Sequence, residues 1–363
     1  MIDDRTTPRR PELLLRASRH RLAEVVDAGL PAIGSGTFLE RIGGRLLVLA
    51  SGGADSTALL VLLAGLAARD SDPSRVLSVL AIDHGLRPDA SAEAACALDV
   101  ARRLGVRDVR VRRVEVVAGG NLLDRAREAR LAAAAAVATE IGATSIALGH
   151  HADDLAESIL LSLARGGGVD ALRSLRPSRD VVVGNGTAVR LLRPLLAARR
   201  AELREMLEEL GVPWRDDPSN ALRTRGAMRS TPEIAALLDR IAAGATDLLD
   251  EVGSLCAFRD AIATRLSPSG TRSIAREEIE RLPSAVQREV LRRFARDAGL
   301  ELPRSVLRAA IERLSRGERA PARFSLSPEL ELAIDAATVA VVPHAKACPR
   351  PCPEPRHWPT PAG

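Results

Sequence analysis

The sequence predicts an α/β fold: a parallel sheet with helices on both faces, followed by a smaller, mostly helical α+β domain. Two observations carry this prediction. Between residues 46 and 164, short apolar runs alternate with helical segments, as parallel strands joined by crossover helices require. Beyond Gly168 the alternation weakens and helical periodicity prevails, which indicates a second domain of different construction.

Each element has its own local signal. The continuous apolar run 46–50 is typical of a strand buried on both faces. The alternating periods then predict strands at 76–83, 109–117 and 144–149, and helices at 56–68, 91–104, 121–141 and 152–164. Farther along we expect an edge strand at 189–192, an amphipathic helix at 199–210, helical segments within 225–263 and 275–316, and short strands within 322–342.

Composition divides the chain into four segments. We expect an N-terminal helical extension (1–40), a main α/β domain (41–228), a smaller helical α+β domain (229–345) and a disordered tail (346–363). Six prolines in the last 15 residues disfavour regular structure. Zinc binding is a minor alternative near this tail, since residues of the right type stand there at an unfamiliar spacing: His344, Cys348, Cys352 and His357.

Composition also excludes several functions. Of 52 basic residues only Lys346 is a lysine, which rules out a Walker A phosphate loop and argues against a Schiff-base lysine. Four Phe, two Trp and no Tyr argue against single-strand binding on stacked aromatic rings. The formal charge of +5 permits a polyanionic partner.

The sequence also carries signals that concern cellular location. There is no apolar run of 18 residues and no basic-then-apolar start, so we expect a cytoplasmic protein without a membrane partner. Four cysteines do not make a disulfide framework in 363 residues. The sequence is compatible with a homodimer.

The strongest motif follows the first strand, where Ser-Gly-Gly-Ala-Asp-Ser leads into a helix. Glycines allow the backbone to approach an anion, and the first N–H groups of a helix point at it. Asp55 would repel a phosphate unless a cation lay between them, so it is the expected Mg²⁺ ligand. The predicted phosphate-binding residues are Ser51, Gly52, Gly53, Ala54, Asp55 and Ser56. The alternative is a tight turn in which Asp55 or Ser56 caps the helix.

Polar side chains also follow the second and fourth strands. Ligands bind beyond the carboxyl ends of parallel strands, so these residues are expected to meet at the phosphate loop. They are Asp83, His84 and Arg87 after one strand, and His150, His151, Asp153, Asp154 and Glu157 after the other. The acids are expected to hold Mg²⁺ or a cationic amine; helix capping and a transition-metal site are the alternatives.

The Ser-Gly-Gly-x-Asp-Ser string is the signature of the PP-loop (N-type) ATP pyrophosphatases, and the chain resembles the tRNA(Ile)-lysidine synthases among them over about residues 45–345. The other matching segments are 83–87 (Asp-His-Gly-Leu-Arg), 121–130 with Arg127 and Arg130, 149–158, 165–168, 193–203 with Arg193 and Arg200, 217–220 with Asp217 and Asn220, 225–229 with Arg225 and Arg229, and 282–292. Departures from the family pattern are Leu123, Leu131, Leu155 and Gly226, where the family has Glu, Tyr, Gln and Asn.

The resemblance implies a ligase that adenylates the wobble cytidine of a CAU-anticodon tRNA(Ile) with ATP and joins free L-lysine to C2, releasing AMP and pyrophosphate. Asp55, Arg127, Arg130, His150, His151, Asp153, Asp154 and Glu157 would be catalytic. Asp83 and His84 would join the loop in binding ATP, and Arg87, Arg193, Arg200, Asp217, Asn220, Arg225 and Arg229 would bind tRNA or substrate.

Two alternatives stand beside this interpretation. A PP-loop tRNA thiolase is disfavoured because no CxxC pair occurs. A divergent, non-catalytic tRNA-binding protein would explain the departures, but it has no need of the intact phosphate loop or of the His150–Glu157 segment.

Overall fold

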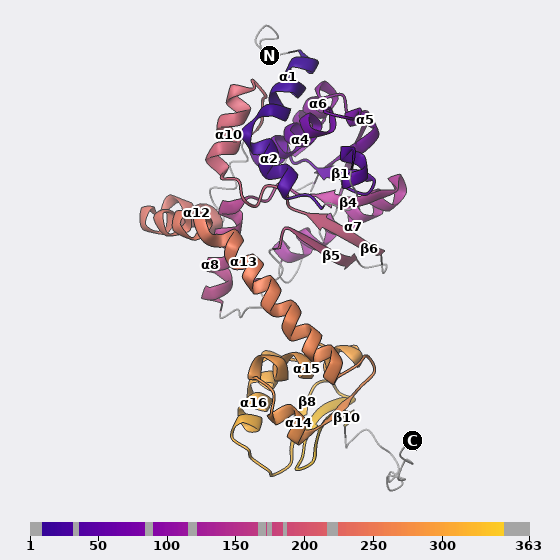
Figure 1. Cartoon of the computed structure of the whole chain (residues 1–363), viewed down its shortest axis with the longest axis vertical. Coiled ribbons are helices and arrows are strands. Elements are labelled where there is room, and N and C mark those ends of the chain that lie inside the picture. The colour runs from indigo at the N-terminus through magenta and orange to yellow at the C-terminus, as the bar shows by residue number, and fades with distance from the viewer. Residues whose placement is uncertain are drawn as a thin grey trace. The chain divides into compact units, whose positions relative to one another are not determined.

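The structure is a computed structural model that describes residues 9–31, 36–83, 90–114, 122–165, 172, 176–183, 187–215 and 224–344 (Figure 1). It divides into two units, 1–252 and 253–363. The division falls inside helix α13 (Pro232–Leu266), whereas the boundary expected from the sequence is 228/229. The tail at 346–363 lies outside the described residues.

The first unit is built on a six-stranded sheet of order β3-β2-β1-β4-β6-β5. Neighbouring strands are parallel except β5 and β6, which form an antiparallel pair. The strands are β1 (Arg45–Leu49), β2 (Leu77–Asp83), β3 (Asp108–Arg113), β4 (Ala143–Ala147), β5 (Ser178–Val183) and β6 (Thr187–Leu192). The predicted parallel sheet is therefore confirmed.

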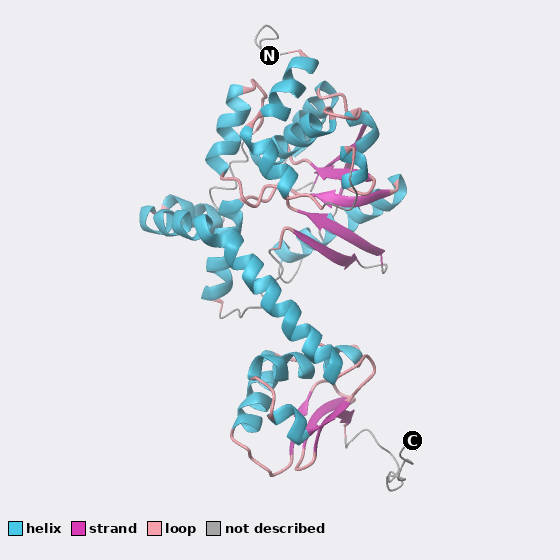
Figure 2. Ribbon diagram, in the orientation of Figure 1, coloured by secondary structure: helices cyan, strands magenta, loops and turns pink. Residues whose placement is uncertain are grey.

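Helices cover both faces of this sheet because consecutive side chains of a strand point to opposite sides (Figure 2). On β1, Leu46 and Val48 pack with α4 (Ala54–Ala67), while Leu47 packs with α7 (Leu122–Ile141) on the other face. The remaining helices of the alternation are α5 (Pro73–Val76), α6 (Ala90–Arg103) and α8 (Ala152–Ala164). Each expected helix of this region is present.

The N-terminal extension is helical, as expected, and it packs on the main domain. It contains α1 (Arg10–Arg19), α2 (Arg21–Ala28) and α3 (Phe38–Arg41). Helix α1 crosses α4 at Gly65, where a Cβ atom would come within 2.8 Å of the Ser18 nitrogen. Together with α10 (Arg200–Glu209), these helices bury α4 almost completely, which explains its uniformly apolar sequence.

One strand assignment was wrong. The segment 189–192 was expected at the edge of the sheet, but β6 lies between β4 and β5, and β5 forms the edge. The sequence of β5 begins Ser-Arg-Asp, its apolar run is only three valines long, and Val182 is exposed, so its signal is weaker than that of a buried strand. An edge strand that faces solvent gives a weak signal, and its partner was mistaken for the edge.

The second unit is a four-stranded antiparallel sheet of order β7-β10-β9-β8 packed against helices. Its core joins residues such as Phe294 and Ile334 from the helices and the sheet. The elements are β7 (Ser273–Ala275), α14 (Arg276–Glu280), α15 (Ser284–Asp297), α16 (Arg304–Ser315), β8 (Ala322–Ser325), β9 (Leu330–Ile334) and β10 (Thr338–Pro343). The expected smaller α+β domain is confirmed.

Helices α8, α12 (Thr224–Ser230) and the first half of α13 form a satellite cluster on the first unit, through residues such as Ala156, Met228 and Leu238. No helix in the described ranges is long and apolar enough to cross a membrane.

Candidate active site at the carboxyl ends of the strands

The phosphate loop joins β1 to α4, and its backbone conformation depends on glycine. Gly52 has φ +81°, a left-handed conformation that favours glycine. Ser56 Oγ accepts from the Ser51 N–H at 3.0 Å and donates to the Gly53 carbonyl at 3.1 Å. The loop is thus shaped by contacts among its own residues and by one remote hydrogen bond, in which the Arg215 N–H donates to the Gly52 carbonyl at 2.9 Å.

The N-terminus of α4 carries the groups expected for an anion site. Its N-cap is Gly53, and within the described part of the chain no side chain caps it. The alternative in which Asp55 or Ser56 caps this helix is therefore wrong. Uncapped N–H groups at the start of a helix favour a negatively charged ligand.

The segment after β4 lies directly against this loop. A Cβ atom on Gly149 would come within 3.0 Å of the Ser56 nitrogen and Cα, so the two strand ends meet through their backbones. His151 is fully buried and is the N-cap of α8, where its Nδ1 lies 3.2 Å from the Asp153 backbone nitrogen. Asp154 accepts in return from the His151 N–H at 3.3 Å. Capping is thus one role of this segment, as the alternative reading expected.

His151 is the point at which the loop and the acids come together. Its Nε2 lies 3.4 Å from Asp55 Oδ2 and 3.4 Å from Asp154 Oδ2, and its Nδ1 lies 3.3 Å from Asp153 Oδ2. Burial lowers the pKa of the imidazole, but the three carboxylates outweigh burial and raise it to about 9. In this arrangement His151 is cationic at neutral pH and balances the surrounding acids.

The acid Asp153 is held by the start of α10. Arg199 donates to its Oδ1 from Nη2 at 2.8 Å, and the Arg200 N–H donates to its Oδ2 at 2.8 Å. Burial raises the pKa of Asp153, yet the hydrogen bonds from His151, Arg199 and Arg200 prevail and hold it well below its usual range. Arg199 also contacts Asp239 of α13. The sequence did not predict that Arg199 joins Asp153 to Asp239, because no sequence motif links these three residues.

Arg200 and Arg229, expected to bind tRNA or substrate, both lie against the His151–Glu157 segment. Arg200 Nε lies 3.2 Å from His151 Nε2, and its Nη2 lies 3.6 Å from Asp154 Oδ1. Arg229 of α12 donates to Glu157 Oε1 at 2.5 Å, and Glu157 is fully buried. The carboxylates of α8 are therefore largely neutralised by arginines from two other helices.

Asp55 has the properties of a ligand for a cation. No described residue donates a hydrogen bond to its Oδ1, although that atom is buried. A buried carboxylate oxygen requires a partner, and a divalent cation between Asp55 and a phosphate would supply one.

The other expected site residues fall into three groups. Arg130 is exposed on α7, and Arg193 is buried, donating to the Arg176 carbonyl at 2.6 Å, a position that suits a structural role better than contact with tRNA. The backbones of Asp83, Arg127 and Arg225 lie at the end of β2, in α7 and in α12. His84, Arg87, Asp217 and Asn220 lie outside the described residues.

Two departures from the family pattern have a packing explanation. Leu155 is buried on α8, and Leu131 packs against the cluster between α7 and the sheet. Apolar side chains are suited to both positions. Gly226 is buried within α12.

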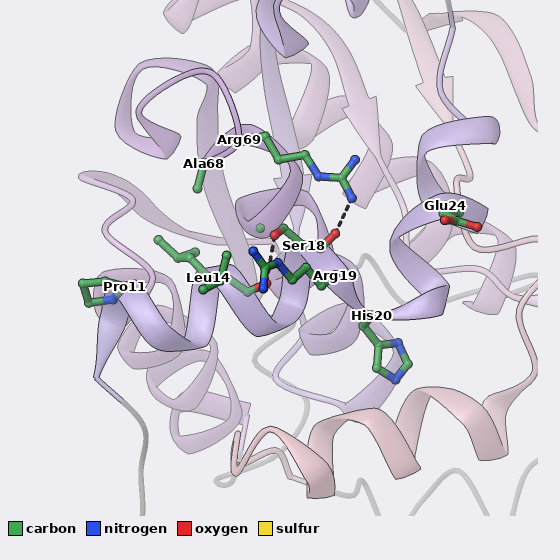
Figure 3. Close-up of a pocket in the computed structure, with 10 residues that line it drawn as sticks. Pro11, Leu14, Ser18, Arg19, His20, Glu24, Ala68 and Arg69 are labelled. Atoms are coloured by element: carbon green, nitrogen blue, oxygen red, sulfur yellow. Dashed lines mark hydrogen bonds between the residues drawn. The ribbon is translucent and has the colours of Figure 1, made fainter.

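A separate cavity of about 810 Å³ lies among α1, α2 and the end of α4 (Figure 3). Its lining combines apolar residues with Arg19, His20 and Arg69, and none of the expected site residues contributes to it. We place the candidate active site at the strand ends because the charged groups and the anion-binding loop converge there.

The comparisons with known proteins agree with this geometry. The PP-loop domain family matches residues 35–231, which cover the sheet, the loop and the acids. The first unit therefore contains a PP-loop domain, a class that binds ATP.

Relatives with curated names specify the family. A tRNA(Ile)-lysidine synthase of Nocardia farcinica is 33% identical over 83% of this chain and 87% of its own length. Another from Novosphingobium aromaticivorans is 38% identical over 58% of this chain and 64% of its own length, and one from Ralstonia nicotianae is 35% identical over 77% and 57%. The chain belongs to the tRNA(Ile)-lysidine synthase family, and it spans between about half and nine tenths of these relatives.

Among solved structures, the U34-tRNA thiolase NcsA of Methanococcus maripaludis is 15% identical, with a TM-score of 0.47 over 63% of this chain and 78% of that one. A similarity of this degree says nothing about the reaction.

Proposed function

We propose that this protein ligates L-lysine to C2 of the wobble cytidine of a CAU-anticodon tRNA(Ile). ATP first adenylates the cytidine O2 with release of pyrophosphate, and the lysine amine then attacks C2 with release of AMP. The observation that carries the proposal is that the phosphate loop with Asp55 meets His151 and Asp154 beyond the carboxyl ends of β1 and β4.

The ATP part of the proposal rests on the loop. No described side chain caps the N-terminus of α4, and the hydroxyls of Ser51 and Ser56 lie 3.1 Å from each other in the loop; we expect these groups to bind the triphosphate. Mg²⁺, held by Asp55, would neutralise the leaving pyrophosphate. Arg127 and Arg130 remain proposed partners of the phosphates, and Asp83 and His84 of the nucleotide.

The lysine part rests on the acids of α8. Asp153 and Glu157 already have arginine partners at 2.8 and 2.5 Å, whereas Asp154 lies 3.6 Å from the Arg200 guanidinium. Asp154 also accepts from the His151 N–H, so all three acids remain proposed partners for the substrate ammonium, which needs carboxylates once it is desolvated. His150 is the better candidate for accepting a proton, since the raised pKa of His151 keeps that imidazole protonated at neutral pH.

The tRNA part rests on positive charge near the site. Arg87, Arg200, Arg225 and Arg229, with Asp217 and Asn220, belong to the segments that match the family, and phosphate contacts from arginines would orient the anticodon loop. Cytoplasmic location and a homodimeric state belong to the same proposal; light scattering of the purified protein tests the dimer.

The decisive experiment incubates the protein with ATP, Mg²⁺, labelled lysine and a CAU-anticodon tRNA(Ile) transcript. We expect label in the tRNA and one AMP for each lysine joined. A transcript whose wobble cytidine is replaced by uridine is the matched control and should take no label. Binding of the tRNA without labelling, under conditions where a known lysidine synthase works, would overturn the proposal in favour of a non-catalytic binder.

A further inference from the structure

The start of α10 is the element that links the acids of α8 to the rest of the first unit. Its first residues, Arg199 and Arg200, supply the side-chain and backbone donors that hold Asp153, and Arg200 also faces His151. A displacement of this helix end would therefore change the positions of several charged groups at once.

Glu202, one turn into α10, fixes this helix end with both of its carboxylate oxygens. Oε2 accepts from the Arg199 backbone N–H at 2.8 Å, as the glutamate of a capping box does. Oε1 accepts from Arg21 Nη1 of α2 at 2.6 Å. One side chain thus ties the start of α10 to the N-terminal helices, which contain none of the expected site residues.

The charge of Glu202 is maintained by these two contacts. Burial raises the pKa of Glu202, but the hydrogen bonds from the Arg199 N–H and the Arg21 guanidinium outweigh burial, so the pKa lies below its usual value. The exposed fraction of the Arg21 side chain is 61% and that of Glu202 is 27%, so the acid is the more enclosed member of the pair. An exposed arginine that pairs with a half-buried acid can orient that acid without contributing much to stability.

The other end of α10 has its own tether, which provides a comparison. Arg16 of α1 donates from Nη2 to the Glu209 carbonyl at 2.6 Å. This contact also joins the N-terminal helices to α10, but it lies two turns away from Arg199 and Arg200. Loss of Arg16 should therefore loosen the far end of the helix and leave the acids of α8 in place.

We propose that Arg21 and Glu202 are positioning residues, through which the N-terminal helices hold the start of α10 against His151 and Asp153 for the ligation reaction. The proposal rests on the proposed function, since it assigns these residues a part in that reaction. Neither residue contacts substrate; each acts through Arg199 and Arg200.

The test compares AMP release and thermal stability for the wild type, Arg21→Ala, Arg21→Lys, Glu202→Ala, the Arg21→Ala/Glu202→Ala double variant and Arg16→Ala. We expect Arg21→Ala to lower kcat about threefold with an unchanged KM for ATP, and Arg21→Lys to restore it, because one charge-assisted bond suffices. Glu202→Ala should lower kcat about tenfold, since it removes the cap as well as the tether. Arg16→Ala should keep the wild-type kcat.

Two results would overturn the proposal. One is an equal loss of kcat in Arg21→Ala and Arg16→Ala, which would mean general loosening. The other is multiplication of the single effects in the double variant, because Arg21 should have no effect once Glu202 is absent.

A second measurement does not depend on turnover. Amide hydrogen exchange should quicken about threefold at 199–203 in Arg21→Ala, and only near 207–210 in Arg16→Ala. If the wild type released no AMP, the proposed function would fail, while this exchange pattern would still decide whether Arg21 holds the start of α10.

Discussion

The phosphate loop and the acid segment after β4 lie at neighbouring strand ends, but they are held in different ways. The side-chain hydrogen bonds of the loop join Ser51, Gly53 and Ser56, residues at most five positions apart, and a single remote bond, from the Arg215 N–H to the Gly52 carbonyl, adds to them. The acid segment is held from a distance: Asp153 by Arg199, 46 positions away, and Glu157 by Arg229, 72 positions away. A loop whose contacts are mostly local can be recognised from its sequence motif. The ion pairs of the acid segment, in contrast, form only when the whole first unit has folded.

Removal of Asp55 gives the largest expected effect, and it tests the chemistry of the loop side. Asp55→Ala should lower AMP release about 1,000-fold, because the carboxylate that would hold the cation beside the phosphates is lost. Asp99→Ala is the control, since Asp99 forms an exposed pair on α6 and should leave the rate unchanged. Unchanged AMP release in Asp55→Ala would remove the basis for a phosphate site at this loop.

Removal of Arg229 tests the remote pairing. Arg229→Ala should lower the free energy of unfolding by about 3 kcal/mol, because Glu157 would stay buried without its cation. Urea unfolding followed by Trp214 fluorescence, in a Trp358→Phe background, reports on the first unit. Adding Glu157→Gln should recover part of the loss.

The matched control for this prediction is Arg190→Ala. Its pair with Asp180 is exposed, so it should cost less than about 0.5 kcal/mol. An equal cost for Arg190→Ala and Arg229→Ala would show that the buried pairing does not hold the acid segment.

Substitution of Gly149 tests the close backbone contact between the segment after β4 and the phosphate loop. Gly149→Ala should cost about 2 kcal/mol, since the added carbon meets backbone atoms of Ser56 that cannot rotate away. Gly244→Ala, in the open middle of α13, should instead add up to about 1 kcal/mol through helix propensity. The same urea measurement checks both, and equal signs would argue against a close contact at Gly149.

The pH dependence of stability gives the smallest expected effect, and it isolates His151. A raised pKa means that the pairing of the protonated imidazole stabilises the fold fully below pH 6.5 and is lost as the pH rises through about 9. The wild type should therefore lose about 1 to 2 kcal/mol relative to His151→Asn between pH 6 and pH 9. Parallel curves for the two proteins would mean that the carboxylates do not hold the charge of His151.

Much of the fold was predictable because its signals are local. Apolar runs located β1, β2 and β4, and the 3.6-residue period located the helices between them. The edge strand β5 was missed because its apolar run is only three residues long and follows three polar residues. In the candidate site, the structure brings the predicted loop and the segment after β4 together, because the carboxyl ends of neighbouring parallel strands lie side by side.

What the sequence by itself determined is the class of fold and the chemistry of the loop, because glycines, hydroxyls and a carboxylate act there through contacts between near neighbours. Only the tertiary structure decided which acids the arginines of the site hold. The sequence singled out Arg200 and Arg229 as site residues, but no local pattern pairs either of them with the acids of α8. The pairing follows from the packing of α10 and α12 against α8, which brings distant charges within hydrogen-bonding range.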